Sequence, residues 1–177
     1  MIDLGIRRAV PADAAVLAEF AARNFTETFA AEVRPEDLQA YLASAFEITQ
    51  QSAELADPDM ATLLAYEREV LVAYAQVQRK APPACVTGES PVELHRFYVD
   101  RRVHATGVAQ RLMAAVREAA RGFGARHLWL STWERNARAL RFYARCGFTD
   151  AGSAVFVVGS DRQLDRILVA PVNAADP

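Results

Sequence analysis

The stretch Glu93–Met113, ELHRFYVDRRVHATGVAQRLM, is the most informative part of the chain. An apolar-rich strand is followed by a short basic turn, then by Thr106 and Gly107, and then by an amphipathic helix. Such a junction gathers free backbone N–H groups and the positive end of a helix dipole at one point. A glycine at that point lets an anion approach the main chain. The segment therefore predicts an anion-binding turn.

Two common nucleotide-binding motifs are absent from this turn. The sequence lacks the G-x-G-x-x-G fingerprint of dinucleotide-binding folds, and no Gly-Lys-Ser/Thr follows as it would in a P-loop. The anion is therefore expected to belong to a different kind of ligand.

The composition is that of a globular protein. Of the 177 residues, 52% are apolar and 24% are charged. We predict one domain over residues 1–172 and a loose tail over residues 173–177. A net charge of −2 argues against nucleic acid as a partner.

The cysteines and the hydropathy of the chain indicate in which cellular compartment the protein is expected. Cys85 and Cys146 make neither a disulfide framework nor a metal quartet, so we expect free thiols and no metal. No window approaches the roughly 20 apolar residues of a membrane span. The sequence therefore predicts a cytoplasmic protein that does not bind membranes.

The pattern of elements predicts an α/β fold with a mixed sheet. Strands 92–99 and 127–132 flank a helix and should be parallel, because a crossover connection of this kind is right-handed. Residues 24–31 look less regular than the helix before them. The predicted strands are 4–8, 60–66, 70–78, 92–99, 127–132, 148–158 and 164–169, and the predicted helices are 12–22, 35–46, 49–56, 108–121 and 137–145.

A second motif follows the turn at a fixed distance. Asn136–Phe148, NARALRFYARCGF, matches N-x-x-A-x-x-x-Y/F-x-x-x-G-F, and His104–Ala109, HATGVA, is similar to Q/R-x-x-G-x-G/A. Together they resemble the GCN5-related N-acetyltransferase (GNAT) family over residues 60–169. The ending Val155–Val169, with the WERN stretch at 133–136, looks most like the bacterial polyamine (spermidine/spermine) acetyltransferase branch.

The resemblance implies the GNAT fold and acetyl-coenzyme A as cosubstrate. Backbone N–H groups of Ala105–Ala109 would bind its pyrophosphate, and the main chain of Val99 would pair with the pantetheine arm. Two positions depart from the family pattern, since His104 replaces Gln or Arg and Ala105 replaces a common glycine. The implied cofactor-binding residues are Val99, His104, Ala105, Thr106, Gly107, Val108, Ala109, Asn136 and Tyr143.

The resemblance also implies two groups that assist the transfer. The N–H of Phe97 would face the thioester oxygen, and Tyr143 would donate a proton or hydrogen bond to the leaving thiolate. Tyr143 could instead simply pack under Phe148, and Asn136 is explained by its helix N-cap position alone.

Three groups compete for the proton of the incoming amine. Glu93 has the spacing from Gly107 of the general base in the histone-acetyltransferase branch, and His95 suits the role by its intrinsic pKa. Solvent is the third acceptor. Glu93 could equally be a carboxylate at a strand start, and His95 a core imidazole. In a regular strand Glu93, His95 and Phe97 share one face. Trp133 would either line the amine pocket or pack in the core.

These observations predict an enzyme that moves an acetyl group to a primary amine by direct attack in a ternary complex. A polyamine or another small amine is the first expectation, and a protein or peptide amine is an alternative. A coenzyme A sensor without catalysis and an unrelated nucleotide binder are the rivals. A homodimer is compatible with the sequence.

Overall fold

The computed structural model describes residues 3–158 and 160–174. Seven strands form one mixed sheet in the order β1-β2-β3-β4-β5-β7-β6, in which β4 and β5 are the parallel pair. The predicted α/β architecture is confirmed. The strands are β1 (Leu4–Arg8), β2 (Met60–Glu67), β3 (Val70–Gln78), β4 (Pro91–Val99), β5 (His127–Trp133), β6 (Thr149–Val158) and β7 (Asp161–Pro171).

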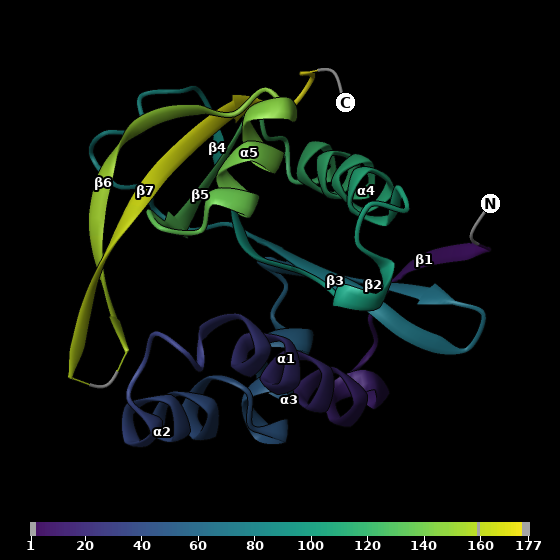
Figure 1. Ribbon diagram of the computed structural model, residues 1–177. Coiled ribbons are helices and arrows are strands. Elements are labelled where there is room, and N and C mark those ends of the chain that lie inside the picture. Colours follow the sequence, from purple (N-terminus) through teal and green to yellow (C-terminus); the bar gives the residue numbers. More distant parts are fainter. Residues whose placement is uncertain (1–2, 159, 175–177) are drawn as a thin grey trace.

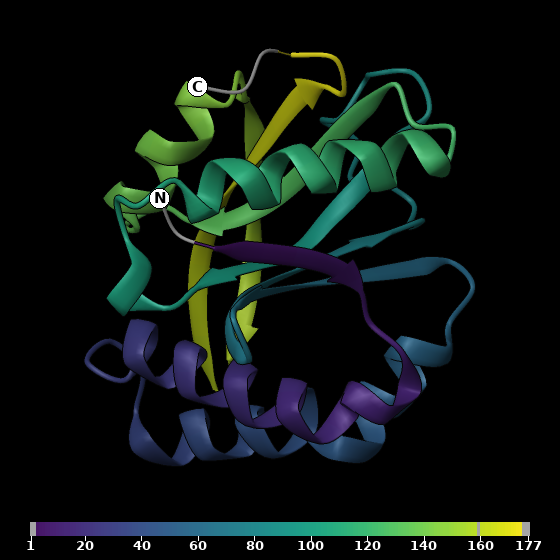
Figure 2. The same ribbon diagram turned by 90° about the vertical axis from the view of Figure 1, so that its right-hand side faces the viewer.

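Helices cover both faces of the sheet (Figures 1 and 2). On one face α4 and α5 pack against a core built on β2 to β5 and β7. On the other face α1, α2 and α3 cover a second core that includes Leu64 and Tyr74 of β2 and β3. The helices are α1 (Ala14–Phe29), α2 (Pro35–Ala45), α3 (Ile48–Ala56), α4 (Val108–Gly122) and α5 (Ala137–Arg145), with short 3₁₀ turns at Pro11–Asp13 and Arg101–Val103.

Helix α1 is longer than the sequence predicts. The expected irregular segment 24–31 is helical as far as Phe29. Its polar side chains bond back to the helix: Thr26 and Thr28 each donate their hydroxyl to the carbonyl four residues earlier, at 2.8 Å. Phe25 and Phe29 supply apolar packing, with Phe25 only 3% exposed. Tertiary packing therefore outweighs the weak helix propensity of Asn and Thr in this segment.

Strands β4 and β5 separate after a short paired region. Only Pro91–Glu93 of β4 pairs with His127–Trp129 of β5, and the register continues no further among the described residues. The carboxyl-terminal halves of β4 and β5 therefore form no hydrogen bonds with each other among the described residues. Ligands of open α/β sheets bind at such strand ends.

A β-bulge interrupts β4 next to this opening. Gln76 of β3 pairs with Arg96, but the next residue of β3 pairs with Leu94, so His95 is the extra residue. In an uninterrupted strand, residues three apart lie on opposite faces. Because of the bulge, Leu94 and Phe97 instead pack against the same core. The expectation that Phe97 shares a face with Glu93 and His95 is therefore wrong, because a bulge shifts the alternation by one residue.

Within the part of the chain that the structure describes, no helix combines the length and the apolar character needed to cross a bilayer. The expected tail 173–177 is described only for Asn173 and Ala174, and Ala174 donates its N–H to Pro171 O at 3.1 Å. The prediction for residues 175–177 lies outside the described residues.

Candidate active site

A cleft of about 810 Å³ opens where β4 and β5 separate. It runs between α1 and α2 on one side and α4 and α5 on the other. Thr106 and Val108 do not line it: the Thr106 hydroxyl donates to Val103 O at 2.6 Å, and Val108 is buried in the core. Eleven of the predicted site residues line the cleft, namely Glu93, His95, Phe97, Val99, His104, Ala105, Gly107, Ala109, Trp133, Asn136 and Tyr143.

The turn before α4 has the geometry of an anion-binding site. Gly107 has φ +89° and ψ −3°, a left-handed conformation that suits glycine, and no side chain caps the helix there. The first helical bond is that of Arg111 N–H to Gly107 O, at 3.1 Å. The N–H groups of the three residues between them therefore have no acceptor in the helix. Ala105 also has positive φ, +61°, so the turn is tight although glycine is missing there.

His104 occupies the position that departs from the family motif. Its Nε2 lies 3.0 Å from Val99 O, and its Nδ1 lies 3.3 Å from Nη1 of Arg138. Because a carbonyl only accepts, Nε2 must donate to Val99 O, and Nδ1 then accepts from the Arg138 guanidinium. His104 thus links the end of β4 to the first turn of α5.

The main chain of β4 directs donors into the opening. Asp100 N–H donates to Val72 O of β3 at 2.8 Å. Successive residues of an extended chain direct their N–H groups to opposite sides, so Val99 and Phe97 direct theirs away from β3. Strand β5 has separated there, and both N–H groups face the cleft.

Helix α5 contributes an amide and a phenol to the same cleft. Asn136 Oδ1 accepts from Ala139 N–H at 3.1 Å, which confirms the predicted N-cap. Tyr143 packs between Phe97 and Phe148, at ring-centroid distances of 6.3 Å and 5.5 Å. Burial, followed by the nearby Cys146, raises the pKa of Tyr143 well above its usual value, so the hydroxyl stays protonated at neutral pH.

Glu93 is a buried carboxylate at the point where β4 and β5 separate. It accepts a hydrogen bond from Gln78, and its Oε2 lies 3.7 Å from both Lys80 Nζ and His95 Nδ1. Burial alone would raise the pKa of Glu93, but the interaction with His95, the hydrogen bond from Gln78 and the charge of Lys80 outweigh it and lower the pKa. Glu93 is therefore ionised at neutral pH and is a weaker base than an ordinary carboxylate.

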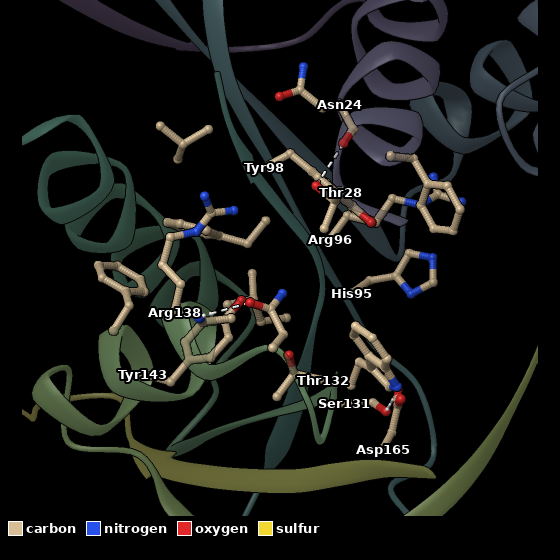
Figure 3. A pocket seen from close by; sticks show the side chains of 18 of the residues that line it. Asn24, Thr28, His95, Arg96, Tyr98, Ser131, Thr132, Arg138, Tyr143 and Asp165 are labelled. Carbon is tan, nitrogen blue, oxygen red and sulfur yellow. Dashed lines mark hydrogen bonds between the residues drawn. The ribbon is translucent and has the colours of Figure 1, made fainter. Parts of the chain in front are cut away.

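The cleft has two halves, and Figure 3 shows Arg138 and Tyr143 on one side of it and Ser131 and Asp165 on the other. The cofactor half comprises the turn before α4 and the facing surface of α5, and its exposed charged side chains are basic: Arg101, Arg138 and Arg145. The acceptor half is walled by rings from four elements, with Phe29 6.0 Å from Trp133 and Tyr41 5.9 Å from Phe156. The residues that define the acceptor half are Phe29, Tyr41, Ser131, Trp133, Phe156 and Asp165.

Ser131 and Asp165 are absent from the sequence-based set of site residues. Asp165 lies opposite Trp133 in the register of β7 and β5, and the Ser131 hydroxyl donates to Asp165 Oδ2 at 2.6 Å. The available signal was an acidic residue beside Arg166 in the predicted strand LDRILV, whose other residues are apolar. Its position beside Trp133 depends on strand register, which no local pattern shows.

Among the residues that the structure describes, no group of three or more His, Cys, Asp or Glu side chains could hold a metal ion. The donors of the cofactor half include main-chain N–H groups, arginines and a phenol. Such donors bind phosphate oxygens and stabilise a developing oxyanion.

The sequence model of the acetyltransferase (GNAT) family matches residues 17–148. The chain belongs to this family. An uncharacterized N-acetyltransferase of Mycobacterium tuberculosis is 32% identical over 157 residues, which cover 89% of this chain and 96% of the relative. An uncharacterized N-acetyltransferase of Lactobacillus delbrueckii subsp. lactis is 30% identical over 146 residues, covering 82% and 84%. The chain is thus a GNAT N-acetyltransferase, with acetyl-coenzyme A as its cosubstrate.

Solved structures share the fold of this GNAT chain. The PaiA N-acetyltransferase of Thermoplasma acidophilum, in complex with coenzyme A, has a TM-score of 0.77 and 17% identity, covering 96% of this chain and 99% of that one. NAA60 of Arabidopsis thaliana, in complex with a bisubstrate analogue, has a TM-score of 0.73 and 15% identity, with the same coverage. At these identities the likeness establishes the fold alone.

Proposed function

We propose that this N-acetyltransferase transfers the acetyl group to the primary amine of a small molecule by direct attack in a ternary complex. The observation that carries the proposal is the two-part cleft, in which the turn of Gly107 and the aromatic acceptor half meet at the separation of β4 and β5. Such a cleft can hold a cofactor and an acceptor together, so no covalent enzyme intermediate is needed.

Each residue of the cofactor half has a role in this proposal. The N–H groups that follow Gly107 bind the pyrophosphate, and the main chain of Val99 and the side-chain NH2 group of Asn136 bind the pantetheine arm. Phe97 N–H stabilises the oxyanion that develops on the thioester carbonyl. The Tyr143 hydroxyl donates to the departing sulfur of coenzyme A.

A polyamine is the first candidate acceptor, and peptide amines are the alternative. The resemblance of Val155–Val169 to the polyamine branch supports the first, as do the carboxylates Glu27, Glu93 and Asp165 around the cleft. Of the other acids in the early helices, Asp37 does not favour a polycation, because Arg34 Nη2 already lies 2.7 Å from its Oδ2.

We further propose that residues 1–172 act as one domain, and that the protein works in a reducing compartment such as the cytoplasm. Cys85 is a free, partly exposed thiol, which suits a compartment without disulfide formation.

A thiol-release screen tests the proposed function. The full chain is incubated with acetyl-coenzyme A and, in turn, with polyamines, monoamines, amino acids and short peptides, and free thiol is measured. We expect release that depends on the amine and saturates with its concentration. Binding of coenzyme A without release for any amine would overturn the catalytic proposal and favour a sensor.

Replacing Glu93 by glutamine should show whether Glu93 stabilises the fold, accepts the proton of the amine, or does both. Because the folded-state pKa of Glu93 lies below its unfolded value, its contribution to stability is present above the unfolded pKa and is lost as the pH falls through the folded pKa. Glu93→Gln should therefore lower the melting temperature at neutral pH and leave it unchanged at low pH. If Glu93 also accepts the amine proton, the pH profile of kcat/KM for the variant loses its acid limb. If the acid limb is retained, another group accepts the proton.

A further inference from the structure

A buried carboxylate in the acceptor half has an oxygen without a partner. Asp165 is only 6% exposed. Its Oδ2 accepts from Ser131, whereas its Oδ1 has no hydrogen-bond partner among the described residues. Burying an unpaired carboxylate oxygen is unfavourable, and Asp165 lines the cleft, so a donor on a bound ligand would stabilise it.

The other buried carboxylates of the described chain show how unusual this arrangement is. In the described residues five of six buried carboxylates have a Lys, Arg or His nitrogen within 4 Å, and Asp165 is the exception. The paired carboxylates and their partners are Asp13 with Arg7, Asp37 with Arg34, Glu54 with Arg96, Glu93 with Lys80 and His95, and Asp100 with Arg23 and Arg102. Among the buried carboxylates of the described residues, Asp165 alone is thus left for a cation from outside.

The surroundings of Asp165 suit an ammonium group with an apolar body. In the sheet register Trp133 of β5 and Ala154 of β6 lie opposite Asp165 on its two sides. Side chains of directly opposed residues lie on the same face of a sheet, so the Trp133 ring stands next to the carboxylate. Tyr41 of α2 is a titratable group that interacts with the charge of Asp165. Burial is the main cause that raises the pKa of Tyr41, and the charge of Asp165 adds to the rise. Burial also raises the pKa of Asp165, although the Ser131 hydroxyl opposes this.

We propose that Asp165, positioned by Ser131, binds the ammonium group of the acceptor before transfer and selects amines that carry no carboxylate on the carbon next to the nitrogen. The nitrogen then loses its proton to Glu93 or to solvent, and the neutral amine attacks the thioester. The inference rests on the proposed acetyl transfer and specifies its acceptor class as alkylamines and arylalkylamines, polyamines included. An α-amino acid is disfavoured because its own carboxylate would approach Asp165 in a region of low dielectric. The rings of Phe29, Trp133 and Phe156 then contact the apolar body of the acceptor, and aromatic faces also attract the cation.

Pairs of acceptors that differ by one carboxylate test this selection. Phenethylamine is compared with phenylalanine, and butylamine with norvaline, in the thiol-release assay with saturating acetyl-coenzyme A. For the unaltered chain we expect kcat/KM to be at least about 100-fold higher for each amine than for its amino acid, a plausible size for burying an unpaired like charge. Asp165→Asn should lower kcat/KM for the amines by about 10-fold, mainly through KM, and should reduce the discrimination.

The affinity for coenzyme A and the stability of the variant distinguish this role from a structural one. Asp165→Asn should leave the affinity for coenzyme A unchanged. Because folding disfavours the charged form of Asp165, the substitution should raise the melting temperature at pH 8 by about 2–4 °C and less at acid pH. The matched control is Asp150→Asn on the neighbouring strand, which removes an exposed carboxylate paired with Arg166 and should leave the kinetics unchanged.

Distinct outcomes overturn the two proposals. If the unaltered chain acetylates phenylalanine and norvaline as well as their amines, or acetylates peptides but neither amine, the assignment of Asp165 fails while acetyl transfer stands. Unchanged KM in Asp165→Asn, or a lowered melting temperature, also contradicts the assignment. Absence of thiol release with every acceptor contradicts the proposed function itself.

Discussion

Replacing Gly107 by alanine is expected to weaken the binding of coenzyme A by about 100-fold, or about 2.7 kcal/mol. Gly107 has φ +89°, and a Cβ built there meets no atom of the protein within 4 Å. The methyl group would therefore extend into open space at the cleft, where we place the pyrophosphate. It would hold the anion away from the N–H groups that follow Gly107. Titration calorimetry with coenzyme A measures the loss.

Gly124 offers a matched control for this substitution. It also has positive φ, +76°, and a Cβ there likewise meets nothing within 4 Å, but it follows the opposite end of α4 and does not line the cleft. Both alanine variants carry the same left-handed strain, about 1–2 kcal/mol of lost stability. Gly124→Ala should bind coenzyme A normally. Equal affinity in the two variants would show that the pyrophosphate does not approach Gly107.

The sequence predicts the elements around this turn well, because their signals are local. The helix that begins after Gly107 and the N-cap of α5 at Asn136 both follow from nearby residues. The extent of α1 was underestimated, because Asn24, Thr26 and Thr28 have weak helix propensity and the packing of Phe25 and Phe29 is a tertiary effect.

Features of the site that depend on strand register were not predictable from the sequence. The bulge at His95 has no local sequence signal, since it is defined by which residues of β3 lie opposite. It rotates Phe97 away from the face of Glu93. The neighbourhood of Asp165 and Trp133 arises in the same way, from the pairing of β7 with β5. Motifs thus predict the cofactor half better than the acceptor half, whose residues come from separate parts of the chain.

Replacing Tyr143 by phenylalanine is expected to lower kcat by about 100-fold, the lower end of the range for a positioned proton donor. The substitution keeps the ring that packs between Phe97 and Phe148, so the fold and the affinity for coenzyme A should be nearly unchanged. Because burial raises the pKa of Tyr143, its ionisation should produce no alkaline limb in the kcat profile of the unaltered enzyme between about pH 7 and 9. Steady-state kinetics with the best amine of the screen measures both effects.

Tyr74→Phe is the control for loss of a buried phenol. Tyr74 is fully buried, its hydroxyl has no hydrogen-bond partner among the described residues, and it does not line the cleft. Its kcat should equal that of the unaltered enzyme. Unchanged kcat in Tyr143→Phe as well would assign the protonation of the leaving thiolate to solvent.

Binding of coenzyme A at the turn before α4 is the claim on which the site assignments depend. Titration calorimetry of the full chain tests it with acetyl-coenzyme A, ATP and NAD as separate ligands. We expect a saturable heat for one acetyl-coenzyme A per chain, with a dissociation constant on the order of micromolar to a millimolar, and none for ATP or NAD. No heat from acetyl-coenzyme A, or the same affinity in Gly107→Ala, would contradict it.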